Sequence, residues 1–210
     1  MNVERLPGGP WGQNAFLVVN GSQSLLIDPG GSADELLQAL SLRQISLVGI
    51  INTHGHFDHI GGVQPLMDAT GAGFYISGRE LPIMRGSNLL RFIFKSKEKV
   101  VVPTVFTDLD LLNNDLHLVG LAIHCYETPG HTPGGYCFRI DDHLFSGDTL
   151  LRKVPGSTDL PGGDAAALAR SIDMLRTLPQ TLILHPGHGY DTTLGEALSQ
   201  LPPPNVPDGE

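Results

Sequence analysis

Short runs of apolar residues, each ended by turn residues, dominate the chain and predict β-strands. In the N-terminal half we expect a hairpin in which residues 15–19 and 24–28 flank Asn20-Gly21. Further strands are expected at 47–51 and 73–77, and then at 116–128, 136–140, 143–146 and 181–184. The strands therefore fall into an N-terminal and a C-terminal set.

Helices are predicted between these strands, where capping residues precede apolar positions at helical spacing. Ser32, with Glu35 three residues later, forms a capping box at the start of one helix. Asp164 is expected to cap another helix that continues to about residue 177. The other predicted helices cover about residues 61–69 and begin at Thr192 or Thr193.

Two strand sets, each accompanied by helices, predict an α/β fold: two mixed β-sheets packed face to face with helices outside, in four αββα layers. The 210 residues, of which 40% are hydrophobic, suit one domain over residues 1–201, followed by a Pro-rich and disordered tail at 202–210. Residues 79–103 lack a clear period. Their apolar part at 89–94 fits either a helix or a loop near the mouth of an active site.

The net charge and the hydropathy pattern argue against two classes of binding partner. The net charge is −9 and no basic stripe is visible, which argues against a nucleic-acid partner. No apolar run approaches the ~18 residues of a membrane span, and the polar N-terminus has no leader-like apolar region. We therefore expect a cytoplasmic protein with no membrane partner. Cys125 and Cys137 lie in apolar runs and are expected to be free, buried thiols.

The strongest chemical signal is the segment 53–59, Thr-His-Gly-His-Phe-Asp-His, which follows the apolar run at 47–51. Imidazole nitrogens and carboxylate oxygens are ligands of zinc and similar metals, and a loop that leaves a strand end can bring them together. From the composition, such a pattern arises by chance about once in a thousand such chains. The segment therefore predicts a metal site.

This H-x-H-x-D-H pattern resembles the signature of the metallo-β-lactamase-fold hydrolases. Three later loops match that signature in order, at 129–135 (PGHTPGG), 145–150 (FSGDTL) and 186–189 (PGHG). The sequence around these loops is most similar to the glyoxalase II-like branch, the hydroxyacylglutathione hydrolases, in a short bacterial-type form. The resemblance runs from about residue 14 to about residue 198 and implies the same αββα fold.

The resemblance also implies two metal ions and a full set of ligands. The first ion takes His54, His56, His131 and Asp148, and the second takes Asp58, His59, His188 and Asp148. It implies that a metal-bridging hydroxide attacks the carbonyl of a small thioester, and Asp58 is also a possible proton acceptor. Zinc is the expected metal, and iron or manganese would suit the same donors.

Substrate contacts are the point at which the chain departs from the family. Many relatives carry a Gly-Arg-Thr-Asp segment whose cation grips a glutathione carboxylate, but here Ser157 stands in the place of that cation. Arg152 and Lys153 are candidate replacements, and Tyr190 is a candidate donor to substrate. The helical C-terminal domain of full-length glyoxalase II is not found after Leu201. The identity of the thioester and the oligomeric state stay open.

Two other activities fit the same residues. A persulfide dioxygenase would use one Fe(II) held by His54, His131 and Asp148, and a lactonase or other ester hydrolase would use the same two metals. Supporting hydrogen bonds are expected from Thr53, Ser146 and Thr149. Of the remaining histidines, His117 and His143 are expected at the surface, His124 could face either way, and His185 is expected to pack at a strand end.

Overall fold

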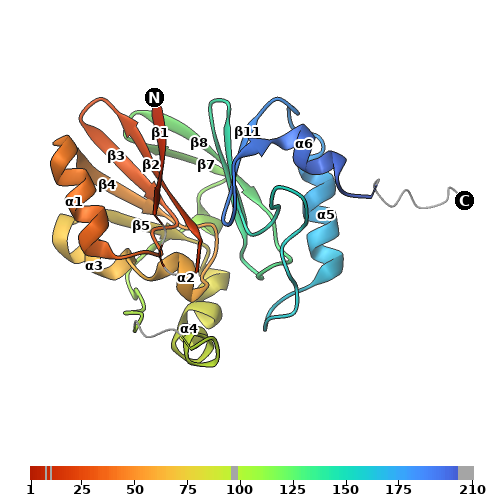
Figure 1. Cartoon of the computed structure of the whole chain (residues 1–210), viewed down its shortest axis with the longest axis horizontal. Coiled ribbons are helices and arrows are strands. Elements are labelled where there is room, and N and C mark those ends of the chain that lie inside the picture. The colour runs from red at the N-terminus through yellow and green to blue at the C-terminus, as the bar shows by residue number, and fades with distance from the viewer. Residues whose placement is uncertain (8, 10, 96–98, 203–210) are drawn as a thin grey trace, which may run out of the picture.

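The computed structural model describes residues 1–7, 9, 11–95 and 99–202. Two six-stranded mixed sheets pack face to face, with helices on the outer side of each (Figure 1). The first sheet has the order β1-β2-β3-β4-β5-β6 and the second β12-β11-β10-β9-β8-β7. The predicted four-layer αββα fold is therefore confirmed.

The elements alternate along the chain in two successive sets. The first sheet contains β1 (Asn2–Pro7), β2 (Asn14–Asn20), β3 (Gln23–Ile27), β4 (Ser46–Ile51), β5 (Gly73–Ile76) and β6 (Thr107–Asp108). The second sheet contains β7 (Asp115–Leu118), β8 (Leu121–Glu127), β9 (Tyr136–Ile140), β10 (His143–Gly147), β11 (Ile183–Pro186) and β12 (Thr192–Thr193). The helices are α1 (Ala33–Arg43), α2 (Phe57–Ile60), α3 (Val63–Thr70), α4 (Leu81–Ile93), α5 (Ala165–Leu175) and α6 (Leu194–Ser199), with 3-10 turns η1 (Gly78–Glu80) and η2 (Leu109–Leu111).

Strands that are buried on both faces explain the near-continuous apolar runs. Along β2, Phe16 and Val18 point into the core between the sheets, whereas Leu17 packs in the outer core beneath the helices. The ring of Phe16 contacts that of Phe145 from the second sheet, with centroids 5.4 Å apart. A separate apolar cluster packs α5 and α6 against the outer face of the second sheet. Three hydrophobic layers thus hold the sandwich together.

The predicted helix starts are confirmed by their side-chain caps. Ser32 accepts a hydrogen bond from the backbone N–H of Glu35, and Asp164 accepts one from Ala167. Thr193, rather than Thr192, caps α6. Each cap satisfies an N–H that the first helical turn leaves without a partner.

The structure differs from the prediction at several elements, and it also contains α2, β6 and β12, which the apolar pattern did not predict. The N-terminal segment forms β1, an edge strand whose alternating polar residues hid it. The expected single strand at 116–128 is two strands, because Val119 and Gly120 both have positive φ and reverse the chain. The segment at 79–103 contains α4, which resolves the choice between helix and loop at 89–93. Apart from Pro202, the predicted tail lies outside the described residues.

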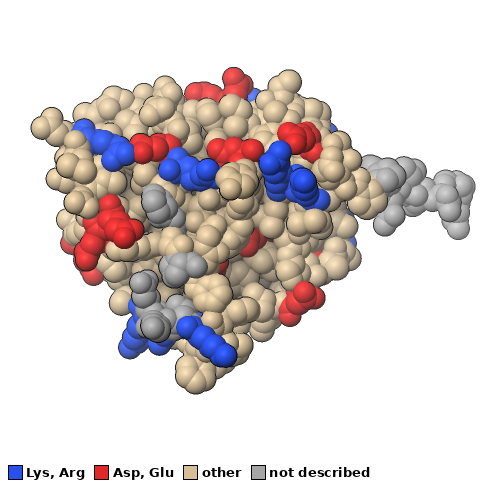
Figure 2. Space-filling model, viewed as in Figure 1, with Lys and Arg blue, Asp and Glu red and all other residues tan. Residues whose placement is uncertain are grey.

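The surface and thiol predictions can be examined in the same structure. On the face shown in Figure 2, Lys and Arg alternate with Asp and Glu rather than forming a stripe. No helix in the described ranges is long and apolar enough to cross a membrane. Cys125 and Cys137 are free and buried, as expected, and burial raises the pKa of these thiols to about 12 and about 11.

Candidate metal centre

Strand directions bring the four histidine and aspartate loops to one edge of the sandwich. Strands β3 and β4 are parallel, and the loop with His54 to His59 leaves the carboxyl end of β4. Strands β10 and β11 are also parallel, and Asp148 and His188 follow their carboxyl ends. Carboxyl ends of neighbouring parallel strands share an edge, which is where ligands gather in open α/β sheets. The N–H of Tyr136 donates to the Thr53 carbonyl (2.9 Å) and joins the two sheets at this edge.

Three groups of donor atoms result among the described residues, and one of them, Asp28 with His54 and His59, shares a histidine with each of the other two. The two groups that share no residue are treated as the clusters of the site. The three-histidine cluster consists of His54, His56 and His131, and the mixed cluster consists of Asp58, His59 and His188. Within each cluster the donor atoms all lie within 4.8 Å of one another. The three-histidine cluster is buried, whereas the side chain of His188 is 29% exposed.

The carboxylate of Asp148 lies between the two clusters. Its Oδ2 is 3.6 Å from Nε2 of His131 and 3.6 Å from Nε2 of His188. Its Oδ1 is 3.7 Å from Nε2 of His59. One carboxylate therefore reaches nitrogens of both clusters, which is the arrangement that a shared ligand requires.

Neighbouring acceptors decide which imidazole nitrogen carries a proton. The Nδ1 atom of His131 lies 2.6 Å from the carbonyl oxygen of Ser157, and a carbonyl can only accept, so this nitrogen is the donor. Its Nε2 then presents a lone pair to Nδ1 of His56, 3.0 Å away. Thr53 donates its hydroxyl proton to Asp28 (2.6 Å) and so accepts from Nδ1 of His54 (2.9 Å). Each of these contacts leaves a nitrogen lone pair facing the centre of the site.

Unsatisfied buried atoms show that these residues fit a metal. Nε2 of His54, Nε2 of His56 and Oδ1 of Asp148 are buried, with no hydrogen-bond partner within the described ranges. Such atoms are rare in folded proteins and call for an ion or water. A divalent cation would satisfy all three, and the nitrogen and oxygen donors suit zinc, iron or manganese alike.

The two clusters differ in charge. Burial, together with the neighbouring imidazoles, lowers the pKa of His54 and lowers that of His56 to about 4. Burial would also lower the pKa of His59, but the carboxylates of Asp58 and Asp148 outweigh it and raise this pKa to about 10. Burial would raise the pKa of Asp58, but the adjacent His59 and His188 hold it below its usual range. His54 and His56 are therefore neutral at pH 7, and the mixed cluster contains opposite charges.

Asp28 is a site residue that sequence reasoning missed. Its two carboxylate oxygens accept from the backbone N–H of Thr53 (2.7 Å), from the Thr53 hydroxyl and from Nδ1 of His59 (3.1 Å). Because its oxygens are occupied in this way, Asp28 orients His59 rather than serving as a ligand. The available signal was its position, at the carboxyl end of the strand that neighbours β4.

Glu80 was also missed. Its carboxylate is completely buried and accepts from the backbone N–H groups of Gly55 and Gly134, each at 2.7 Å. Burial raises the pKa of its carboxyl, and the two backbone hydrogen bonds partly oppose this rise. No local sequence pattern singled it out, because its partners lie in two other loops.

The residues proposed for substrate contact are dispersed. Ser157 touches a ligand residue only through its carbonyl, while its hydroxyl bonds to Asp159 (2.8 Å). Arg152 pairs with Glu196 of α6 (3.2 Å), and Lys153 is exposed. Tyr190 is 69% exposed, with the Arg5 guanidinium 5.5 Å from its ring centroid. Among the described residues, no hydrogen bond or ion pair joins Arg152, Lys153 or Tyr190 to a candidate ligand.

Other predicted polar residues hold the surrounding loops. Ser146 donates to the Leu150 carbonyl (2.7 Å), and Thr149 donates to Thr128 (3.0 Å), so both fix the loop that carries Asp148. His185 packs at its strand end as expected, with its ring stacked on Phe145. His143 is only partly exposed, because its ring stacks on that of His185. His117 and His124 are exposed.

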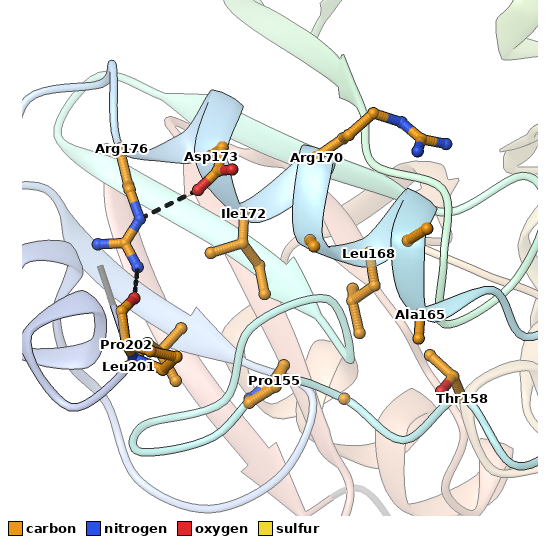
Figure 3. A pocket seen from close by; sticks show the side chains of 13 residues that line it. Pro155, Thr158, Ala165, Leu168, Arg170, Ile172, Asp173, Arg176, Leu201 and Pro202 are labelled. Atoms are coloured by element: carbon orange, nitrogen blue, oxygen red, sulfur yellow. Dashed lines mark hydrogen bonds and ion pairs between the residues drawn. The ribbon is translucent and has the colours of Figure 1, made fainter. Parts of the chain in front are cut away.

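One sizeable cavity does not coincide with the ligand clusters. This groove of about 540 Å³ runs between α5 and the segment 155–158 (Figure 3). Apolar side chains such as Leu168 and Ile172 line it, and at its rim Arg176 pairs with Asp173 and donates to the Pro202 carbonyl. None of the seven candidate ligands lines this groove. The donor chemistry, rather than cavity size, therefore locates the functional site.

Comparisons with known proteins agree with this geometry. A family model described as the metallo-beta-lactamase superfamily matches residues 8–188. A protein of Haemophilus influenzae named hydroxyacylglutathione hydrolase GloC is 31% identical, over 93% of this chain and 94% of that one. Among solved structures, TTHA1623 in a di-iron-bound form has a TM-score of 0.85 and 34% identity, over 95% of this chain and 98% of that one. The BLEG-1 B3 metallo-beta-lactamase has a TM-score of 0.85 and 30% identity, over 94% of this chain and 97% of that one. The chain belongs to the metallo-β-lactamase superfamily, most of whose members are metallohydrolases.

Proposed function

We propose that this protein is a dinuclear metal-dependent hydrolase of small thioesters, similar to the hydroxyacylglutathione hydrolases. The observation that carries the proposal is the position of Asp148, whose two oxygens lie 3.6–3.7 Å from nitrogens of both clusters. A mononuclear site would use this carboxylate at one cluster only, whereas a two-metal site uses its position beside both. The relative named hydroxyacylglutathione hydrolase GloC supports the choice of thioester.

In this proposal each cluster holds one ion and Asp148 contacts both. Two divalent ions, when bound, would lower the pKa of a shared water toward neutrality and polarise a substrate carbonyl. Zinc is the proposed metal because neutral imidazoles dominate the donor set. The relative with a di-iron-bound structure keeps iron as the second choice.

The protein's own residues supply orientation and proton handling. The hydrogen bond from His131 to Ser157 and that from His59 to Asp28 fix the two rings with Nε2 directed inward. The carboxylate of Asp58 is ionised at neutral pH and serves first as a ligand; because its pKa lies below the usual range, it can hold a proton from the attacking water only briefly. A thiolate leaves without strong acid assistance, so the reaction needs no further acid from this edge.

Glutathione itself is not required by the proposal. Ser157 offers no cation, and Arg152 is paired with Glu196. A small acyl thioester that binds mainly through its carbonyl fits these residues best. S-lactoylglutathione is the first substrate to test, and simpler acyl thioesters are the second.

Elemental analysis and a substrate panel test this function together. Protein as purified and after metal loading is expected to contain two metal equivalents and to hydrolyse thioesters faster than lactones. His188→Ala should abolish this activity, and the matched control His117→Ala, at an exposed histidine, should preserve it. One metal equivalent without thioesterase activity would refute the proposal. Oxygen consumption with glutathione persulfide by the iron-loaded protein would instead indicate a dioxygenase, and a clear preference for lactones would indicate a lactonase.

A further inference from the structure

Glu80 is the most deeply buried carboxylate next to the candidate site, and it is not a member of either cluster. It ends η1, immediately before α4, with no exposed surface. A buried carboxylate is costly unless hydrogen bonds compensate it. Part of the compensation here comes from the backbone N–H groups of Gly55 and Gly134, which both donate to the carboxylate. The two oxygens are thus divided between two loops that are far apart in sequence.

Those loops carry the two parts of the three-histidine cluster. Gly55 lies between His54 and His56, and Gly134 lies three residues after His131. Oε2 of Glu80 holds the first loop and Oε1 holds the second, so one rigid carboxylate sets the separation of the loops. Charge-assisted hydrogen bonds of this kind are short and directional.

The close approach depends on the two glycines. A Cβ atom on Gly55 would lie 2.8 Å from Met84 Cγ and 3.1 Å from Glu80 Oε2. A Cβ atom on Gly134 would lie 2.9 Å from the Cβ of Ser77. Only residues without side chains allow the backbone to reach the carboxylate, so the contact is built into both loops.

Helix α4 also hydrogen-bonds to the loop that carries His54 and His56. The hydroxyl of Ser87 in this helix donates to the carbonyl of Gly55 (3.2 Å). Both the N–H and the C=O of the residue between His54 and His56 are therefore held from the same side. The mixed cluster has no contact with Glu80 among the hydrogen bonds of the described residues, and it is supported by Asp28 instead.

We propose that Glu80 is a positioning residue for the three-histidine cluster. It sets the distance between the His54/His56 loop and the His131 loop, and it thereby sustains the affinity of that cluster for its metal with little effect on the mixed cluster. This inference rests on the proposed two-metal function. Glu80→Gln is the sharpest test, because it keeps the shape but turns an NH2 group toward one of the two N–H donors.

The experiment is a titration of metal-free protein with Co²⁺, followed by visible absorption and by equilibrium dialysis with elemental analysis. An Asp58→Ala background isolates the three-histidine cluster, and a His56→Ala background isolates the mixed cluster. We expect Glu80→Gln to weaken Co²⁺ binding at the three-histidine cluster by about 10–100-fold, the usual effect of losing an outer-shell partner, and to shift its absorption bands. At the mixed cluster the change should stay below about 3-fold. Glu80→Asp, which keeps the charge but shortens the reach, should fall between wild type and Glu80→Gln.

Two controls separate positioning from general stability. Glu196→Gln makes the same chemical change on an exposed residue of α6 and should leave both cobalt affinities unchanged. Leu175→Ala removes core contacts beneath α5 and should lower the melting temperature without changing the cobalt bands. If Glu80→Gln does not fold, the selective loss must still appear in Glu80→Asp.

The outcomes distinguish this inference from the function on which it rests. If wild-type protein binds fewer than two Co²⁺ ions, the proposed function fails. If wild type binds two and Glu80→Gln or Glu80→Asp matches it at both clusters, only the Glu80 inference fails. Equal losses at both clusters would also overturn it, because they would indicate general destabilisation.

Discussion

The two halves of the candidate metal centre, the three-histidine cluster and the mixed cluster, differ in burial, in charge and in the residues that support them. The three-histidine cluster is buried, its His54 and His56 are neutral at pH 7, and the Glu80 carboxylate supports it by accepting hydrogen bonds from the backbone of its two loops. The mixed cluster is more open, contains charged groups, and is supported by Asp28 through side chains. Within the proposed function, the buried half would retain its metal, and the half that is open to solvent at His188 would handle protons and substrate.

The largest expected effect comes from removing the residue that joins the halves. Asp148→Ala should lower kcat/KM for thioester hydrolysis by about 1,000-fold or more, since several kcal/mol of metal and transition-state stabilisation depend on the shared carboxylate. Elemental analysis should show the loss of at least one metal. Asp173→Ala, at an aspartate on α5 that pairs with Arg176, is the control. Two retained metals with full activity would contradict the role of Asp148.

Gly187→Ala should disturb the mixed cluster selectively. A Cβ atom at this position would overlap Oδ1 of Asp148 and lie 2.8 Å from Cε1 of His59. We expect the affinity of the mixed cluster for Co²⁺ to fall by about 100-fold, because both groups must move. Gly86→Ala on α4, where nothing lies within 4 Å of the new atom, should leave metal binding unchanged and stabilise the fold by about 0.5–1 kcal/mol. Equal metal affinities in the two variants would show that the contact is not limiting.

Asp28→Asn should have a smaller and less selective effect, because Asp28 contacts His59 directly and also holds Thr53, which accepts from Nδ1 of His54. The backbone at Asp28 has φ of +50°, which asparagine tolerates, so the substitution removes charge without straining the chain. The loss of the carboxylate behind His59 should weaken the mixed cluster by about 10-fold, near the low end for outer-shell partners. Cobalt titrations in the two isolating backgrounds measure this. A loss confined to the three-histidine cluster would reverse the proposed division between the halves.

The smallest and broadest effect is the dependence on pH. In metal-free protein, the His59 pKa of about 10 exceeds the usual 6.5, so its stabilising contribution is complete below pH 6.5 and is lost as pH rises toward 10. The His56 pKa of about 4 lies below 6.5, so its contribution is present above pH 6.5 and is lost as pH falls toward 4. Urea unfolding should therefore show a maximum of stability near pH 6.5.

His59→Gln is the variant that sharpens this measurement. In this variant the free energy of unfolding should fall less between pH 6.5 and pH 10 than in the wild type, and its fall below pH 6.5 should be unchanged. Metal affinity supplies a second readout, because His59 must release a proton before it binds an ion, whereas His54 and His56 are already neutral. From pH 9 to pH 7 the affinity of the mixed cluster should fall more steeply than that of the three-histidine cluster. Parallel slopes would refute the charge difference.

Sequence reasoning selected candidate ligands that the fold brings together, because each of them follows an apolar strand within a short recognisable segment. His54 to His59, His131, Asp148 and His188 all meet at one edge for this reason. The two sheets and their helices could be predicted from the sequence for a similar reason, since burial on both faces leaves continuous apolar runs.

The residues that support the candidate ligands could not be predicted from local sequence patterns. Glu80 acts on the backbone of two distant loops, so neither its spacing nor its neighbours reveal it. Strand β1 was missed because it is stabilised by pairing with β2 and has no apolar pattern of its own. The turn at Val119 was missed because a β-branched residue rarely adopts the left-handed conformation that it has here. Substrate contacts depend on side-chain partners such as the Arg152–Glu196 pair, which only the folded chain establishes.

The separation of the ligands along the chain has a consequence for biosynthesis. His56 and His131 are 75 residues apart, and His59 and His188 are 129 residues apart. A ribosome releases the N-terminal sheet with its histidine loop well before the strand that precedes His188. The nascent chain can therefore present no complete site, and an ion captured early would be held by too few donors to persist. Metal acquisition should be one of the last steps in the maturation of this protein, after the second sheet has closed onto the first.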